Sequence, residues 1–371
     1  MPSFDALLDL PLYPVDRYAP LADRLKRLLA TAADVIFVQA EAILALEATA
    51  ASLAAPGLTA VNIVTSSYGS YFGTWLKRGG ASVTDVVAEP GRPITVAAVK
   101  AALDALPSVG LIAVVHAESA NGSLNPLPEL AALAKARGAL LVVDAVASFG
   151  GHSVPVDALG VDVAIVGPQK ALGGPTGLSV LSVSPRAWQQ IAQSKARLSP
   201  SNLALSDVRD NWLDRGRGSP PGMPAALEFW ALDAAIARIE AEGLDKVIAR
   251  HALAARASRA GLRALGITPW IEDDTTASVL VTAAPIPDGI SSRALVGAAA
   301  AFGVGLSPAP GDMAERLVRL DHTGPRAAFP VVLANVIAYG GALQRLGWTV
   351  DIPAAGRAVT EVYSEALRSS R

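Results

Sequence analysis

Cysteine is absent from the 371-residue sequence, which excludes disulfides, thiolate metal sites and cysteine nucleophiles. The chain has no basic block or acidic tail, and its formal net charge is −2, so neither nucleic acid nor an anionic membrane is an expected partner. Its four histidines are scattered without metal-ligand spacing, and we expect no metal site. We find no signal-peptide pattern and no apolar run long enough to span a membrane. These absences favour a cytoplasmic protein that acts on small molecules.

The apolar content is high, since 51% of the residues are hydrophobic, and a chain of this length usually folds as more than one domain. Short β-branched runs alternate with alanine-rich helical segments, which predicts a mostly parallel sheet with helices on both faces. The predicted strands are 35–38, 60–64, 111–115, 140–143, 163–166 and 178–183. Weaker strands near 278–282 and 316–320 predict a smaller α+β domain. We expect an N-terminal arm at residues 1–20, a large domain at 21–255 and a small domain at 256–371.

Two of these runs lead to residues with complementary chemistry. Asp144 ends the run at 140–143, and Lys170 follows the run at 163–166 after a Gly-Pro turn. The carboxyl ends of parallel strands are where α/β folds place ligands. An amine that forms a Schiff base and an acid that holds a pyridine nitrogen are the two groups that pyridoxal chemistry needs. The residues alone also allow purely structural roles, a surface lysine after a turn and an aspartate that caps a helix.

The motifs around these two residues resemble those of the class V aminotransferases, which are fold-type I pyridoxal-phosphate enzymes. The resemblance rests on VDAVASFGG and GVDVAIVGPQKALGGPTG, with VVHAESANGSLNP upstream and VRLDHTGP downstream. It covers residues 34–324 in the family's order and spacing. It implies an α/β fold with a large domain, built on a mostly parallel mixed sheet flanked by helices, and a smaller C-terminal α+β domain. It also implies aminotransferase activity.

The resemblance gives roles to the residues around the pyridine ring. Lys170 would form the Schiff base and carry protons between the ring and the substrate, and Asp144 would pair with the pyridine nitrogen. Val146 would pack on one face of the ring. Tyr68, in SSYGSYFG, would lie on the other face. Without the resemblance, the residues favour a core aromatic role for Tyr68 and a surface salt bridge for Arg319.

Substrate contacts are also implied. Ser119 would bond the ring's 3-hydroxyl, and Arg319 would bind the substrate carboxylate as a bidentate pair. A second arginine, which one relative carries upstream of the first, is replaced here by Pro310. Arg316 or Arg326 could take its place, or the amino acceptor could differ.

The segment after the first strand departs from the family pattern. Relatives hold the cofactor phosphate there in a small polar cup at a helix start, where backbone N–H groups and the helix dipole bind anions. This chain has FVQAEAILALEA, with Glu41 and Ala42 in the cup. A carboxylate ~4 Å from one phosphate charge costs about 4 kcal/mol at an effective dielectric constant of about 20. Glu41 could instead bond a free 5′-hydroxymethyl group, or could only cap the helix. Gln169 could contact the 5′ substituent or only brace the lysine loop.

One family member that takes unphosphorylated pyridoxamine as a substrate has a segment similar to residues 39–48. The resemblance therefore implies an aminotransferase that moves an amino group between free pyridoxamine and a small 2-oxo acid. Pyruvate would give pyridoxal and L-alanine, in vitamin B6 degradation. No permanently bound cofactor is expected, because pyridoxal on Lys170 is then a substrate. The alternative is a conventional pyridoxal 5′-phosphate enzyme of the alanine–glyoxylate or serine–pyruvate type, and a lyase or a silent binding protein on the same fold are further alternatives.

The segment 197–224 is rich in proline, glycine and serine, and we expect a long functional loop there. Family active sites form at a dimer interface, which implies a homodimer or homotetramer with this loop crossing between subunits. In relatives the loop supplies a hydroxyl group to the partner's phosphate. Gly222 stands near that position here, in agreement with Glu41 in the cup.

Overall fold

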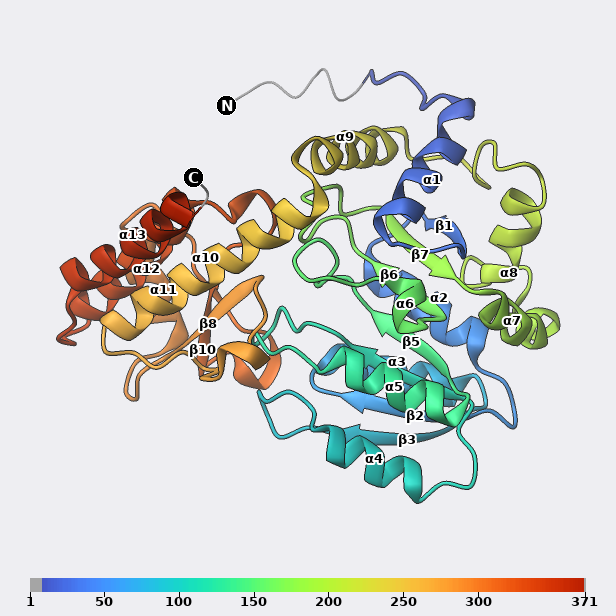
Figure 1. Cartoon of the computed structure of the whole chain (residues 1–371), viewed down its shortest axis with the longest axis horizontal. Helices are drawn as coiled ribbons and strands as arrows, with labels where there is room; N and C mark the ends of the chain where they lie inside the picture. The colour runs from blue at the N-terminus through green and yellow to red at the C-terminus, as the bar shows by residue number, and fades with distance from the viewer. Residues whose placement is uncertain (1–8, 370–371) are drawn as a thin grey trace.

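The computed structural model describes residues 9–369, and its centre is a seven-stranded sheet (Figure 1). The strands lie in the order β1-β7-β6-β5-β4-β2-β3, and β7 runs antiparallel to both of its neighbours. Their bounds are β1 Asp34–Val38, β2 Thr59–Val64, β3 Ser82–Val87, β4 Leu111–Val115, β5 Leu140–Asp144, β6 Val163–Val166 and β7 Ser179–Val183. The prediction of a mostly parallel mixed sheet is confirmed.

Helices cover both faces of this sheet. Right-handed crossovers between parallel strands place α2 and α3 on one face and α4, α5 and α6 on the other. The bounds are α1 Tyr18–Leu28, α2 Ala42–Leu53, α3 Ser67–Arg78, α4 Val96–Asp104, α5 Leu127–Arg137, α6 Val156–Leu159, α7 Pro185–Leu198, α8 Leu205–Val208 and α9 Ala226–Glu242. Local sequence sets several starts and stops. Ser66 and Ser184 cap α3 and α7, and Gly138 ends α5 in the left-handed conformation that glycine adopts without strain.

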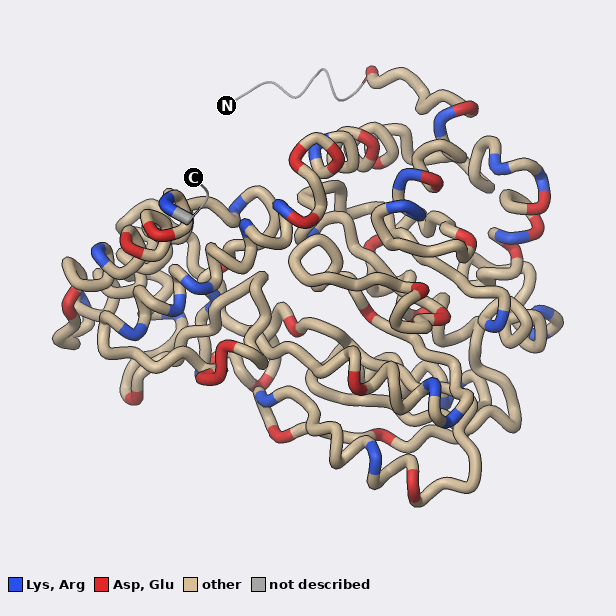
Figure 2. Tube along the Cα trace, in the orientation of Figure 1, with Lys and Arg blue, Asp and Glu red and all other residues tan. Residues whose placement is uncertain are grey.

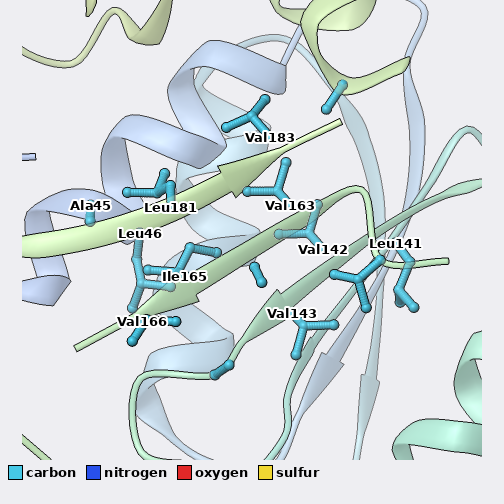
Figure 3. Close-up of a cluster of buried hydrophobic side chains, with 14 of the residues drawn as sticks. Ala45, Leu46, Leu141, Val142, Val143, Val163, Ile165, Val166, Leu181 and Val183 are labelled. Atoms are coloured by element: carbon cyan, nitrogen blue, oxygen red, sulfur yellow. The ribbon is translucent and has the colours of Figure 1, made fainter. Parts of the chain in front are cut away.

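The core between α2 and the sheet fixes where α2 begins (Figure 3). Ala45 and Leu46 are buried against β6 and β7, near Ile165 and Leu181. A fully buried Leu or Ile side chain contributes about 1.5–3 kcal/mol. This packing holds the first turn of α2, and with it Glu41, at the carboxyl end of β1.

A three-stranded antiparallel sheet, in the order β8-β10-β9, forms the smaller C-terminal unit. Its strands and helices are β8 Val281–Pro285, β9 Ser307–Pro308, β10 Leu317–Asp321, α10 Leu244–Ala264, α11 Ser292–Ala300, α12 Phe329–Arg345 and α13 Ile352–Ser369. Helix α10 connects the two cores, since Val247 packs in the large one and Ala254 in the small one. The predicted limit between residues 255 and 256 falls inside this continuous helix, and the domain limits stay predictions.

The segment before α1 packs on α9. The Tyr13 hydroxyl donates a hydrogen bond of 2.8 Å to Asp233, and Arg17 forms an ion pair with the same carboxylate. Residues 1–8 of the predicted arm lie outside the described residues, and α1 begins at Tyr18, before the predicted end of the arm.

Three local expectations differ from the structure. Strand β3 was not predicted, because it lies at the sheet edge and Val86 is its one buried residue. The strand expected at 278–282 begins at Val281, because Ser278 donates its N–H to the carbonyl of Gly122 outside the sheet. The expected loop 197–224 contains α8 and a π-helical turn at Arg209–Leu213, whose Trp212 is 1% exposed and contacts Phe37.

Charge is spread over the described part of the chain. Figure 2 shows basic and acidic residues interspersed along the trace, without a long block of one sign. None of the helices within residues 9–369 combines the length and the apolar character that crossing a membrane requires.

Candidate active site

The carboxyl ends of five parallel strands bring the predicted site residues together. In an open α/β sheet this edge is where ligands bind. The side chains come from the loop after each strand: Glu41 and Ala42 after β1, Tyr68 after β2, Glu118 and Ser119 after β4, Asp144 and Val146 from the end of β5, and Gln169 and Lys170 after β6. Arg319 reaches the same place from β10 of the small sheet.

Two adjoining cavities hold these residues. The inner cavity, about 40 Å³, is lined by seven of the nine predicted residues: Glu41, Ala42, Tyr68, Ser119, Asp144, Val146 and Lys170. The outer cavity, about 350 Å³, is lined by Gln169 and Arg319, and its wall also contains Ser119, Ala147 and Lys170. Lys170 therefore lies between two cavities. The inner cavity is lined by apolar and acidic side chains, and the outer cavity contains Arg319.

The backbone around Lys170 is fixed from both domains. Within the turn, Lys170 N–H donates to Gly167 O at 3.2 Å, and Gly174 N–H donates to Pro168 O at 2.7 Å. Gly324 of the small domain packs on this turn so closely that a Cβ there would lie 2.8 Å from the Lys170 carbonyl oxygen. His251 holds Gly324 in place, because its Nε2 accepts the Gly324 N–H at 2.9 Å. Lys170 therefore lies in a turn whose backbone is held by hydrogen bonds and by close packing against Gly324.

Asp144 is buried at the end of β5, and one carboxylate oxygen accepts the Val146 N–H at 2.9 Å. Its other oxygen, Oδ2, has no partner within residues 9–369, and the residue lines the inner cavity. Burial raises the pKa of Asp144 to about 7, with further raising from Glu118 and Glu41 and lowering from the Val146 N–H and Lys170. A cationic N–H placed in the cavity would reverse this effect, since an opposite charge favours the carboxylate.

Glu118 lies in the motif VVHAESANGSLNP, but the sequence predicted no role for it. It is fully buried, its Oε1 accepts the Thr65 hydroxyl at 2.6 Å, and its Oε2 has no partner among the described residues. Asn125 in turn donates to Thr65 at 3.0 Å. Burial raises the pKa of Glu118, which favours a neutral acid beside Asp144. Its signal in the sequence is an acid three residues after the apolar run 111–115.

Glu41 accepts one backbone N–H at the start of α2 and one side-chain N–H from the lysine turn. Its Oε2 accepts the Ile43 N–H at 2.8 Å, and its Oε1 accepts the side-chain N–H of Gln169 at 2.8 Å. The helix start contains no hydroxyl side chain, since the local sequence is Ala-Glu-Ala-Ile. Glu41 therefore caps the helix, and the same carboxylate holds Gln169, while its role toward a 5′ substituent stays a prediction.

Tyr68 and Val146 both line the inner cavity. Tyr68 lies in the first turn of α3, whose cap Ser66 accepts the Tyr68 N–H at 3.3 Å. Burial raises the pKa of Tyr68, and the negative charges of Glu41, Asp144 and Glu118 raise it further. The phenol stays neutral at ordinary pH and offers a flat surface to a ring.

Arg319 is the cation of the outer cavity that faces Ser119. One of its terminal nitrogens donates to the Ser119 carbonyl at 3.3 Å, while its buried Nε has no partner within residues 9–369. Of the two arginines considered as replacements at the Pro310 position, Arg326 lines the outer cavity. Arg316 instead lies over the Trp270 ring, with its guanidinium carbon 4.9 Å from the ring centroid.

Comparisons with known proteins identify the family. The family model for aminotransferase class-V matches residues 18–297. Pyridoxamine–pyruvate transaminase of Mesorhizobium japonicum is 35% identical over 332 residues, which cover 89% of this chain and 84% of that protein. The crystal structure of pyridoxamine–pyruvate aminotransferase from Mesorhizobium loti matches with a TM-score of 0.89 at 34% identity, covering 94% of this chain and 89% of that one.

A further relative is more distant. Alanine–glyoxylate aminotransferase of Callithrix jacchus is 28% identical over 288 residues, covering 76% of this chain and 69% of that protein. The chain belongs to the class V aminotransferase family, and its fold is fold type I of the pyridoxal-phosphate-dependent enzymes. It is an enzyme of the transferase class that acts on small molecules.

Proposed function

We propose that this aminotransferase moves an amino group between free pyridoxamine and a small 2-oxo acid such as pyruvate, giving pyridoxal and L-alanine. The observation that carries the proposal is the carboxylate of Glu41, which accepts the Ile43 N–H and the Gln169 amide at the start of α2. The names of the relatives from Mesorhizobium support it. The reaction would serve vitamin B6 degradation in the cytoplasm.

The residues fit the pyridine ring but not a 5′-phosphate. A phosphate at a helix start needs free N–H donors. Here the Glu41 carboxylate already accepts the Ile43 N–H, and it would repel a phosphate charge ~4 Å away by about 4 kcal/mol, roughly a thousandfold in Kd. A 5′-hydroxyl group can instead donate a hydrogen bond to Glu41. We infer that pyridoxal 5′-phosphate is not retained and that the ring is a substrate.

The chain's own residues can then divide the work of amino transfer. A protonated pyridine ring withdraws electrons from the atom that loses a proton. Asp144 would keep that ring nitrogen protonated by accepting its N–H at the unpaired Oδ2. Lys170 Nζ, between the two cavities, would take the proton from one carbon and return it to the other. Arg319 would orient the oxo acid through its carboxylate, and Tyr68 and Val146 would enclose the ring.

The second candidate is a conventional pyridoxal 5′-phosphate enzyme of the alanine–glyoxylate or serine–pyruvate type. The alanine–glyoxylate relative and the general cofactor use of the family favour it. It requires a phosphate site other than the start of α2. The two candidates therefore differ in a measurable way, through the 5′ substituent that the enzyme accepts.

We also propose that a second subunit completes the site, as a homodimer or homotetramer. Large apolar side chains are exposed on the two helices that contribute residues to the inner cavity, where Leu44 of α2 and Tyr71 of α3 are 42% and 49% exposed. Met223, next to Gly222 in the predicted crossing loop, is 84% exposed. Such residues are typical of a surface that a partner covers.

The direct test is the ratio of kcat/KM for pyridoxamine to that for pyridoxamine 5′-phosphate, with pyruvate as acceptor. The proposal expects a ratio of about a thousand, the factor that the charge repulsion implies. Comparable values for the two amines would favour the conventional enzyme instead.

A further inference from the structure

Strand β10 presents two charges to the outer cavity. Arg319 and Asp321 are two positions apart on the strand, so their side chains leave the same face of the small sheet, about 7 Å apart along it. Both line the cavity that Lys170 borders. An acid therefore lies beside the arginine that would bind the substrate carboxylate.

Asp321 is held in a fixed position. Its Oδ1 accepts the Thr323 N–H at 2.9 Å, and its Oδ2 lies 3.3 Å from Nε of Arg326. Its backbone carbonyl accepts the side-chain amide of Asn335 at 2.9 Å. The carboxylate is thus fixed by the turn at Thr323, independently of any ligand.

Arg326 is the second arginine of the outer cavity, and Asp321 neutralises it. Both members of this pair are about half exposed, at 49% and 45%, so they face the cavity rather than the protein interior. Without Asp321, the cavity would contain Arg319 and Arg326 as two free guanidinium groups, which is the arrangement that binds two carboxylates. With Asp321, Arg319 remains the one guanidinium of this cavity that has no carboxylate partner among residues 9–369.

We propose that Asp321 makes the acceptor site selective for 2-oxo acids that carry a single carboxylate. A dicarboxylic acid held by Arg319 at its first carboxylate would bring the second toward Asp321, which repels it and already binds Arg326. Specificity of this kind comes from a repulsive group built against the competing ligand. The inference rests on the proposed function in one respect, namely that a 2-oxo acid occupies the outer cavity.

The test compares pyruvate with 2-oxoglutarate as acceptors in Asp321→Asn, Arg326→Gln and the double variant. Asparagine keeps an oxygen for the Thr323 N–H, so the turn is preserved while the charge is removed. Acetate and succinate serve as unreactive probes of the same site through their inhibition constants. Arg316→Gln is the matched control, since it removes a nearby positive charge that lies over Trp270 outside the cavity.

We expect Asp321→Asn to lower the pyruvate to 2-oxoglutarate ratio of kcat/KM at least about tenfold, and to tighten succinate relative to acetate. Adding Arg326→Gln should reverse both changes, and Arg326→Gln alone should raise the ratio above that of the native enzyme. Ratios within twofold of the native value in Asp321→Asn, or an equal change in Arg316→Gln, would overturn the proposal. The inhibition constants are measurable with pyridoxamine or its phosphate ester as donor, so failure of the proposed function is seen separately, in the donor preference.

Discussion

Gln169 donates a hydrogen bond of 2.8 Å to Glu41 across 128 positions of sequence, and this bond joins the start of α2 to the turn that carries Lys170. The same carboxylate caps the helix through the Ile43 N–H. The side chain that would set the chemistry of the proposed 5′ site therefore also contributes to the local fold. Variants of Glu41 must therefore separate the cap from the charge.

The substitution Glu41→Ser separates the helix cap from the negative charge. Serine is as good an N-cap as an acid, so Glu41→Ser should keep the helix start while removing the charge and adding a hydroxyl group. We expect the preference for pyridoxamine over its 5′-phosphate to fall about a hundredfold or more in steady-state kinetics. Glu41→Ala should show the same loss of preference and also unfold about 1 kcal/mol more easily.

The matched control is Glu47→Gln, on the same helix but outside both cavities. It should leave the preference unchanged. If Glu41→Ser keeps the native preference, Glu41 acts only as a helix cap.

The pH profile should report Asp144. In the free protein its pKa is about 7, raised from 3.8 mainly by burial, so the carboxyl is increasingly protonated as the pH falls below 7. The protonated form cannot accept the N–H of a pyridinium ring. The value of kcat/KM for pyridoxamine should therefore fall about tenfold per pH unit below pH 7, while kcat should hold to lower pH because the bound cation lowers the pKa.

The inflection should persist in Glu41→Ser and disappear in Asp144→Asn, whose activity should be low throughout. A flat kcat/KM profile between pH 8 and pH 5.5 in the native enzyme would mean that Asp144 does not control binding in its free form.

Replacing Glu118 by a neutral residue of the same shape should be tolerated, but replacing it by a smaller residue should not. Because burial favours its neutral form, Glu118→Gln should keep activity within about threefold and accept the Thr65 hydroxyl as before. Glu118→Ala leaves a cavity and removes the acceptor of the buried Thr65 hydroxyl, which should cost about 2 kcal/mol or more in the free energy of unfolding. Chemical denaturation and kinetics together measure both effects. A large loss of activity in a stable Glu118→Gln would show that the ionised form is needed.

Gly324 should be required for the position of the lysine turn. An alanine there would place Cβ 2.8 Å from the Lys170 carbonyl oxygen, and the residue has φ +61°. Gly303 has φ +73° but open space around it, so Gly303→Ala has the backbone strain alone, about 1–2 kcal/mol. We expect Gly324→Ala to lose more stability than Gly303→Ala in thermal unfolding, and to lose activity about tenfold or more. Equal effects in both variants would show that the contact with Lys170 is unimportant.

The sequence predicted those parts of the fold and site in which one local signal is sufficient. Strands such as β4 and β6 are buried on every residue, and Asp144 and Lys170 stand at the ends of such strands. The edge strand β3 has no comparable apolar signal. No sequence pattern predicts contacts between distant segments, such as the hydrogen bond from Gln169 to Glu41.

The arrangement of charged residues in the outer cavity was also not predictable from the sequence. The sequence predicted no role for Asp321, since its pairing with Arg326 depends on how the turn after β10 folds back. The choice between Arg316 and Arg326 depends on the stacking of Arg316 on Trp270, which no spacing in the sequence indicates.

The central claim, that this site takes the unphosphorylated ring, is tested most directly at Lys170 itself. The native protein is incubated with equal concentrations of pyridoxal and pyridoxal 5′-phosphate, the adduct is trapped with borohydride, and the Lys170 peptide is weighed by mass spectrometry. The account predicts that the peptide carries the pyridoxal mass with little or none of the phosphorylated form. A peptide that carries mainly the phosphorylated form would contradict the account.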